Sequence, residues 1–198
     1  MPNPNAYYDS LAICMKLGKY LGNTSITQIH LFAYLSCLLS LFKEHPVSMW
    51  GYSFSVTTTS YPYSVDIDEE IINLVNNDCL SRNNDCLKVT ELGKERYKLL
   101  SELSQYTERE LFIKGACSTT LALPVGFVRR AVSQESEITH AVALEQRSLL
   151  LSEGAVNDIY KQFSTLSSII GVDTKEMIVP AVLWLTCVAS SELFWGMI

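Results

Sequence analysis

Two adjacent stretches decide the fold: residues 61–77, YPYSVDIDEEIINLVNN, and residues 79–97, CLSRNNDCLKVTELGKERY. The first stretch predicts a helix over 66–76, because its apolar residues recur at helical spacing. These residues are Val65, Ile67, Ile71, Ile72, Leu74 and Val75. Ser64 is the predicted N-cap, and the carboxylates that follow it are favourable beside the positive end of a helix dipole.

The second stretch predicts a β-hairpin followed by another helix. Cys79-Leu80 and Cys86–Val89 are short apolar runs on either side of a polar turn, which is typical of two antiparallel strands. Thr90 is the predicted N-cap of the next helix. Gly93 is expected to let that helix approach the hairpin closely, because glycine carries no side chain.

Upstream residues supply the remaining elements of the same module. Helices are predicted over 7–21 and 24–42, the second capped by Thr24 or Ser25 and apolar on more than one side, so that it should be buried centrally. Residues 50–59 alternate aromatic or β-branched residues with small polar ones and predict a strand. The order helix, strand, helix, hairpin, helix is the winged-helix pattern.

Residues 25–103 also resemble the signature of bacterial winged-helix domains, "GPYS … L … GLI … YxLTxxG". The matching residues are Tyr61–Ser64, Leu74–Asn77 and Leu87–Gly93, and the run VTELGKERY is the most specific part. The resemblance implies that the hairpin is the wing and that residues 66–76 occupy the place of the recognition helix.

The sequence after Tyr106 predicts helices and no strong strand. They are expected over 108–116, 127–131, 136–151 and 154–170, with a last apolar helix that begins at Asp173 or Thr174. The predicted fold class is therefore mainly α with a small β-hairpin. A winged helix-turn-helix domain with an N-terminal helix is expected over 1–105, and an all-helical region over 106–198.

The composition limits the classes of function. The chain has 198 residues, of which 48% are hydrophobic and 18% charged, with a formal net charge of −6 and a pI of about 5.1. So many apolar residues exclude a disordered chain. The acidic balance argues against a generic electrostatic nucleic-acid binder, which needs clustered Lys and Arg. Any contact with nucleic acid is expected to be indirect.

Residues that could carry chemistry do not form a recognisable site. The six cysteines form no CxxC pair and are interpreted as buried free thiols of a cytoplasmic protein. His30, His45 and His140 stand apart from other metal ligands, so no metal site is expected. Nucleophile and phosphate-binding motifs are absent from the sequence. The prediction is a non-enzymatic chain without a cofactor.

Charged residues give two candidate features. Asp66, Asp68, Glu69 and Glu70 are either a metal or acid–base site or the acidic start of a helix, and the helix-dipole interpretation is favoured. These carboxylates would repel DNA phosphates. Candidate contacts with nucleic acid or an acidic partner are Arg129, Arg130 and Lys88, with an ordinary solvated helix face as the alternative for the arginine pair.

The C-terminal segment is the most apolar part of the chain. Residues 177–189 are nearly all apolar, yet Pro180 and the polar residues 190–192 interrupt the run, so a buried helix is favoured over a membrane span. The candidate partner-binding residues are Trp184, Leu193, Phe194 and Trp195, because aromatic residues concentrate at interface hot spots. Simple core packing is the alternative.

An acidic winged helix with a helical C-terminal region resembles the small middle component of bacterial ABC three-component (Lamassu-type) defence systems. That resemblance implies a non-catalytic accessory subunit that bridges an SMC-like ATPase and an effector nuclease in an anti-phage or anti-plasmid complex. The alternatives are a winged-helix DNA-binding transcriptional regulator, which would need a basic recognition helix, and an antitoxin or adaptor. No membrane partner is expected.

Overall fold

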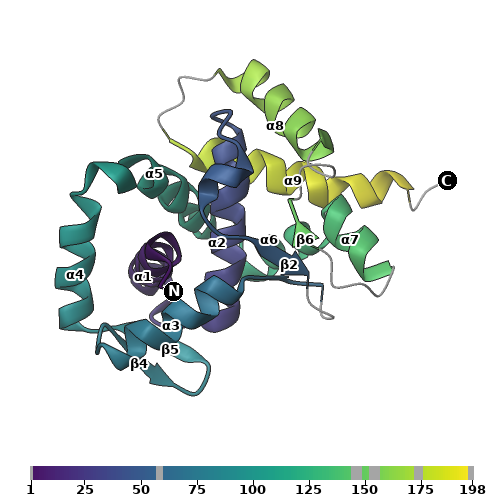
Figure 1. Ribbon diagram of the computed structural model, residues 1–198. Helices are drawn as coiled ribbons and strands as arrows, with labels where there is room; N and C mark the ends of the chain where they lie inside the picture. The colour runs from purple at the N-terminus through teal and green to yellow at the C-terminus, as the bar shows by residue number, and fades with distance from the viewer. Residues whose placement is uncertain (1, 57–59, 144–148, 152–156, 172–175, 196–198) are drawn as a thin grey trace.

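The computed structural model describes residues 2–56, 60–143, 149–151, 157–171 and 176–195, with only the backbone described for 137, 157–158 and 191–195 (Figure 1). Within these residues the fold is mainly helical. The α-helices are α1 (Pro4–Leu21), α2 (Ile26–Leu41), α3 (Val65–Asn76), α4 (Glu91–Ser101), α5 (Ser104–Ser118), α6 (Val125–Ser133), α7 (Ser136–Ala143), α8 (Asn157–Ile170) and α9 (Ile178–Trp195). The 3-10 helices are η1 (Val47–Trp50) and η2 (Thr119–Leu121). The β-strands are β1 (Thr24–Ser25), β2 (Phe54–Val56), β3 (Pro62–Tyr63), β4 (Leu80–Asn83), β5 (Cys86–Val89) and β6 (Leu149–Leu150).

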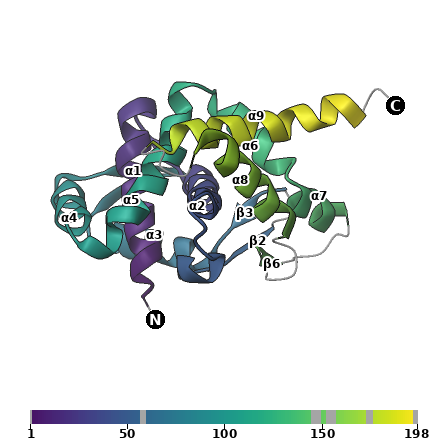
Figure 2. The ribbon, with the colours of Figure 1, turned by 90° about the horizontal axis from the view of Figure 1, so that it is seen from above.

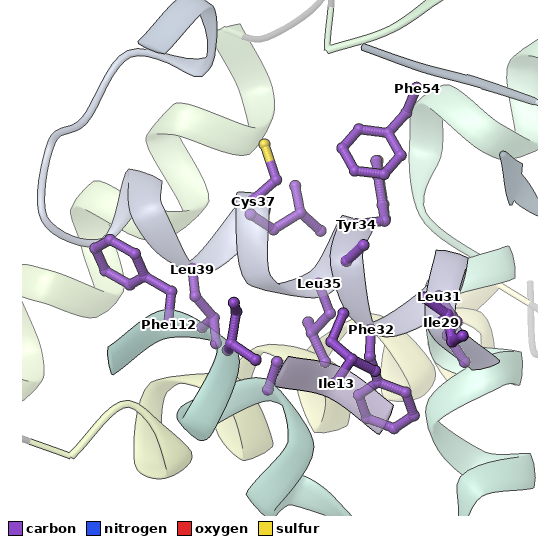
Figure 3. Packing of buried hydrophobic residues seen from close by; sticks show 14 of the residues in the cluster. Ile13, Ile29, Leu31, Phe32, Tyr34, Leu35, Cys37, Leu39, Phe54 and Phe112 are labelled. Carbon is purple, nitrogen blue, oxygen red and sulfur yellow. The ribbon is translucent and has the colours of Figure 1, made fainter. Parts of the chain in front are cut away.

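Helix α2 is the centre of the fold. Every side chain from Ile29 to Leu41 is buried, because apolar residues occupy all sides of this helix. Helices α1, α3, α5, α6, α8 and α9 all contact it. Figure 3 shows α2 side chains packed with Ile13, Phe54 and Phe112, which come from three other elements. The predicted central burial of this segment is confirmed.

The N-terminal sheet contains the predicted hairpin. Strand β5 lies between β4 and β1, and both pairings are antiparallel. Thr90 caps α4 as predicted, since its Oγ1 accepts the amide hydrogen of Gly93 at 3.0 Å. A Cβ atom on Gly93 would overlap the backbone carbonyl oxygen of Cys79, which confirms that the close approach of α4 to the hairpin needs glycine.

We therefore expect Gly93→Ala to lower the free energy of unfolding by about 1–3 kcal/mol, the usual cost of overpacking. Urea titration followed by circular dichroism measures this loss. Gly126→Ala is the matched control, because a Cβ atom there meets nothing within 4 Å and the residue is also helical. A Gly93→Ala variant as stable as the wild type would mean that α4 does not approach the hairpin this closely.

A second three-stranded sheet corrects several predictions. Strand β2 covers only the middle of the predicted strand over 50–59, and residues 57–59 lie outside the described part. Pro62–Tyr63, which lies outside the predicted strand, pairs antiparallel with β2. The predicted helix over 136–151 ends at Ala143, and Leu149–Leu150 pairs with the other edge of β2.

The prediction of an all-helical region after residue 105 is therefore wrong. Its physical reason is tertiary: Leu150 is buried opposite Phe54, so pairing across the sheet outweighs local helical preference. Leu144 of that predicted helix and the predicted starts of the last two helices, at Gly154 and at Asp173 or Thr174, lie outside the described residues.

At the starts of three helices, the structure shows which side chains form N-capping hydrogen bonds. Ser25 and Gln28 form a reciprocal capping box on α2, which selects Ser25 over Thr24. Helix α1 begins earlier than expected, because the Asn3 side chain caps it and Pro4 occupies its first turn. Ser64 occupies the N-cap position of α3, as predicted, but its side chain makes no capping hydrogen bond.

Side-chain hydrogen bonds join α1 to α5. They cross the domain boundary that the sequence predicts between residues 105 and 106. Asp9 is fully buried and accepts bonds from Arg109 Nε at 2.5 Å and Nη2 at 2.8 Å. The Arg109 guanidinium carbon lies 3.8 Å from the centre of the Trp50 ring. Burial opposes the charge of Arg109, but Asp9 outweighs burial and raises the pKa of Arg109 above its ordinary value.

A second polar group joins α1, α4 and α5. Glu110 accepts hydrogen bonds from Tyr8, Tyr97 and Lys16, and the Tyr8 and Tyr97 hydroxyls lie 2.7 and 2.6 Å from its oxygens. Burial and the bond to Glu110 raise the pKa of Tyr97 to about 12. These bonds hold α4 against the body of the protein.

The cysteines are all free, as predicted, but not all are buried. Cys86 and Cys187 are exposed, and the other four are buried. Among the described helices, none alone is both long and apolar enough to cross a membrane. Residues 104–121 and 125–133 reach that length and hydropathy only as a pair bent by 117°.

Candidate protein-binding surface

Helix α3 lies at the molecular surface between α1 and the β4–β5 hairpin (Figure 1). Ile67, Ile71 and Leu74 form its buried face and pack into the common core. The N-terminal segment of the chain crosses its first turns, because Asn3 bonds both to α3 and to Gly51.

The acidic side chains of α3 accept hydrogen bonds mainly from other residues of the same chain. Glu70, 1% exposed, accepts from the Asn3 backbone amide at 2.6 Å and from Asn73 Nδ2 at 3.0 Å. Asp66 accepts from Asn3 Nδ2 at 2.9 Å. Asp66 and Asp68 also lie in the first turn, where the helix dipole favours them. The carboxylates fix the N-terminus of the chain to α3.

The buried His30 side chain contacts the residues that directly precede α3. Its Nδ1 accepts the Ser64 backbone amide at 3.2 Å, and its ring packs against Tyr63 with ring centres 4.9 Å apart. Burial lowers the pKa of His30 to about 4, although Asp68 acts in the opposite direction. His30 is therefore neutral near pH 7 and acts as a positioning group for the β3–α3 turn.

The outward face of α3 carries apolar and acidic side chains. Val65 is 57% exposed and Ile72 is 50% exposed, and the exposed Glu69 and Asn76 lie on the same side of the helix. The sequence prediction placed Val65 and Ile72 on the apolar, inward side, and the structure corrects this. A turn of about 100° per residue would have separated them from Ile67, Ile71 and Leu74.

The predicted basic contacts are exposed but lie on separate elements. Lys88 lies on β5 in the N-terminal sheet, whereas Arg129 and Arg130 lie on α6, which packs against α2, α7 and α9. Near Lys88, Glu91 and Lys94 form an intrahelical ion pair, with Nζ and Oε1 2.6 Å apart. The basic residues named from the sequence therefore do not form one patch.

Trp184 lies in the core of the C-terminal region. It is 1% exposed, its ring stacks on Phe163 with centres 5.6 Å apart, and its Nε1 donates to Gln162 Oε1 at 2.9 Å. It also lines the inner side of a cleft of about 530 Å³ between α8 and α9, together with Leu166, Ile169, Cys187 and Val188.

The other candidate partner-binding residues of the C-terminal segment come after the residues that line this cleft. Leu193, Phe194 and Trp195 belong to the last turns of α9, which project away from the other helices in both ribbon views (Figures 1 and 2). Their side chains lie outside the described part of the structure, so their role as partner-binding residues stays a prediction.

Within the described residues, no group of three or more His, Cys, Asp or Glu side chains is arranged to hold a metal ion. Comparison of the chain with protein-family models, curated proteins and solved structures found no match.

Proposed function

We propose that this chain is a non-catalytic accessory subunit that binds a larger protein through the outward face of α3. The proposal rests on which α3 side chains are bonded within the chain and which are exposed. Asp66 and Glu70 are engaged by Asn3, while exposed Val65 and Ile72 face outward with Glu69. Apolar side chains beside a carboxylate suit a protein partner better than a phosphate backbone.

We further infer that the region over residues 1–105 contains a winged helix, with α3 in the position that reads DNA in other winged-helix domains. The elements α1, β1, α2, α3, β4 and β5 follow one another in this order, with η1, β2 and β3 between α2 and α3, and the strand order is β1–β5–β4; both support this assignment. DNA-reading helices donate hydrogen bonds to base edges and carry Lys or Arg toward phosphates. Helix α3 contains neither Lys nor Arg, so its exposed face is better suited to a protein.

The sequence resemblance suggests the kind of complex. In a bacterial anti-phage or anti-plasmid system of the ABC three-component type, this chain would bridge an SMC-like ATPase and an effector nuclease. In that role DNA would be sensed by the larger subunits, and this chain would need no cofactor.

The test is co-purification of the tagged chain with the products of its neighbouring genes, among which the proposal predicts an SMC-like ATPase and a nuclease. We expect stable binding by the wild type and at least ten-fold weaker binding by Val65→Asp/Ile72→Asp, because two charges would be buried in an apolar contact. Leu121→Asp is the control, since this side chain is 63% exposed and lies on η2.

DNA binding separates the alternative functions. A transcriptional regulator would bind duplex DNA below micromolar concentrations at low salt, with a steep salt dependence. That result, or wild-type chain that binds none of the neighbouring proteins, would contradict the proposed function. An antitoxin would bind a single small toxin rather than the ATPase.

A further inference from the structure

A small pocket lies between α1, β5 and the first turn of α4. Helix α1 contacts both of the other elements (Figure 1). The pocket has a volume of about 210 Å³, and Lys19, Lys88 and Lys94 are among the residues that line it. The buried Cys14 and Leu87 side chains also line it and make its floor apolar. We call it the lysine pocket. None of its described lining residues belongs to α3.

Gly18 leaves the lysine pocket open on the α1 side. It lies four residues after Cys14, so both residues occupy the same face of this helix. A Cβ atom on Gly18 would meet nothing within 4 Å. Glycine is less favourable than alanine inside a helix, and here no described neighbour lies close enough to require it. The missing side chain instead gives a group from another molecule access to the apolar floor.

The lysines give the pocket a positive charge. The chain as a whole has a formal net charge of −6, yet the described residues that line the pocket include three lysines and neither Asp nor Glu. Lys19 and Lys88 are exposed. Lys94 pairs with Glu91, and their side chains are 51% and 85% exposed. An exposed pair of this kind is weak, so Lys94 can exchange this partner for an incoming anion. The pocket therefore favours a negatively charged ligand.

The volume and lining of the pocket indicate the kind of ligand. Pockets that enclose a whole small-molecule ligand have about 300–1,000 Å³, so about 210 Å³ suits one anchoring side chain of a larger partner. A nucleic-acid backbone would use the lysines but leave the apolar floor unfilled. We propose that the lysine pocket binds an acidic segment of a protein, with one apolar side chain on the floor and carboxylates beside Lys19, Lys88 and Lys94. This site goes beyond the proposed function, because it uses α1, β5 and α4 rather than α3.

Fluorescence anisotropy of a fluorescein-labelled peptide, EELFEE, tests the apolar part of the site. We expect the wild type to bind it with a Kd below about 1 mM, as a weak complex. Gly18→Leu fills the pocket and should weaken binding about ten-fold or more. Gly126→Leu is the matched control, because Gly126 is also helical and open to an added side chain. A wild type that does not bind, or a Gly18→Leu variant that binds equally well, would overturn the proposal.

Charge reversal tests the lysines. Lys19→Glu/Lys94→Glu should weaken binding of EELFEE about ten-fold or more, because the carboxylates of the peptide would then meet like charges. Lys114→Glu/Arg130→Glu is the matched control, since it makes the same change of net charge at exposed residues that do not line the pocket. If the two double variants bind the peptide equally, the lysines do not recognise it and the proposal fails.

Other ligands and the proposed function are tested separately. The peptide EESSEE should bind more weakly than EELFEE and should not respond to Gly18→Leu. If EESSEE or a short duplex DNA binds the pocket as tightly as EELFEE, the pocket recognises negative charge alone and the proposal is wrong. Val65→Asp/Ile72→Asp should bind EELFEE normally, so failure of this site and failure of the α3 contact are distinguishable. Thermal melts confirm that every variant is folded.

Discussion

Asp9→Ala is expected to lower the free energy of unfolding by about 3–5 kcal/mol, the usual cost of leaving one partner of a buried ion pair. Arg109 is 9% exposed and bonds to both oxygens of Asp9, and the Tyr52 hydroxyl donates to the same carboxylate at 2.5 Å. The variant leaves the guanidinium charge enclosed by Trp50 and Tyr52 without its counter-ion. Urea denaturation at pH 7, followed by tryptophan fluorescence, measures the loss.

Glu91→Ala is the matched control for this prediction. It removes an ion pair of comparable length, Lys94 Nζ to Glu91 Oε1 at 2.6 Å, but Glu91 is 85% exposed. Exposed pairs contribute at most about 1 kcal/mol. Asp9→Leu/Arg109→Met should recover much of the stability, because it removes both charges together. A loss below about 1 kcal/mol in Asp9→Ala would show that the pair is not buried in solution.

Trp184→Ala is expected to cost about 3–5 kcal/mol, as for other large aromatic side chains removed from a core. The substitution removes the stack on Phe163 and leaves Gln162 without its donor. It also enlarges the adjacent cleft between α8 and α9. The change in unfolding free energy distinguishes a core residue from a binding residue, which are the two interpretations of Trp184 that the sequence allows.

Cys187→Ala provides the comparison on the same helix and the same cleft. Cys187 is exposed, so its replacement should change the unfolding free energy by no more than about 0.5 kcal/mol. If Trp184→Ala is as stable as Cys187→Ala but loses the protein partner, Trp184 acts at an interface instead. If the Trp184→Ala variant has a lower free energy of unfolding and still binds the partner at low temperature, the role of Trp184 is core packing.

The candidate surface was predictable in part. The sequence placed the acidic residues at the start of a helix, because Asp66 and Asp68 follow a turn and precede apolar residues at helical spacing. It did not predict that Asn3 would bond to Asp66 and Glu70. That contact joins residues more than 60 positions apart in the chain, and no local pattern encodes it. The exposure of Val65 and Ile72, by contrast, follows from the helical turn of about 100° per residue, which separates them from Ile67, Ile71 and Leu74.

The sequence by itself determined the elements whose signals are local. The all-round apolar α2, the β4–β5 hairpin, the Thr90 cap and the glycine contact at Gly93 each depend on residues close together in the chain or on one residue type. Only the tertiary structure decided the pairing of Leu149–Leu150 with β2 and the burial of Asp9 against Arg109. Each of these depends on segments about 100 residues apart, whose encounter is set by the shape of the whole core rather than by local preference.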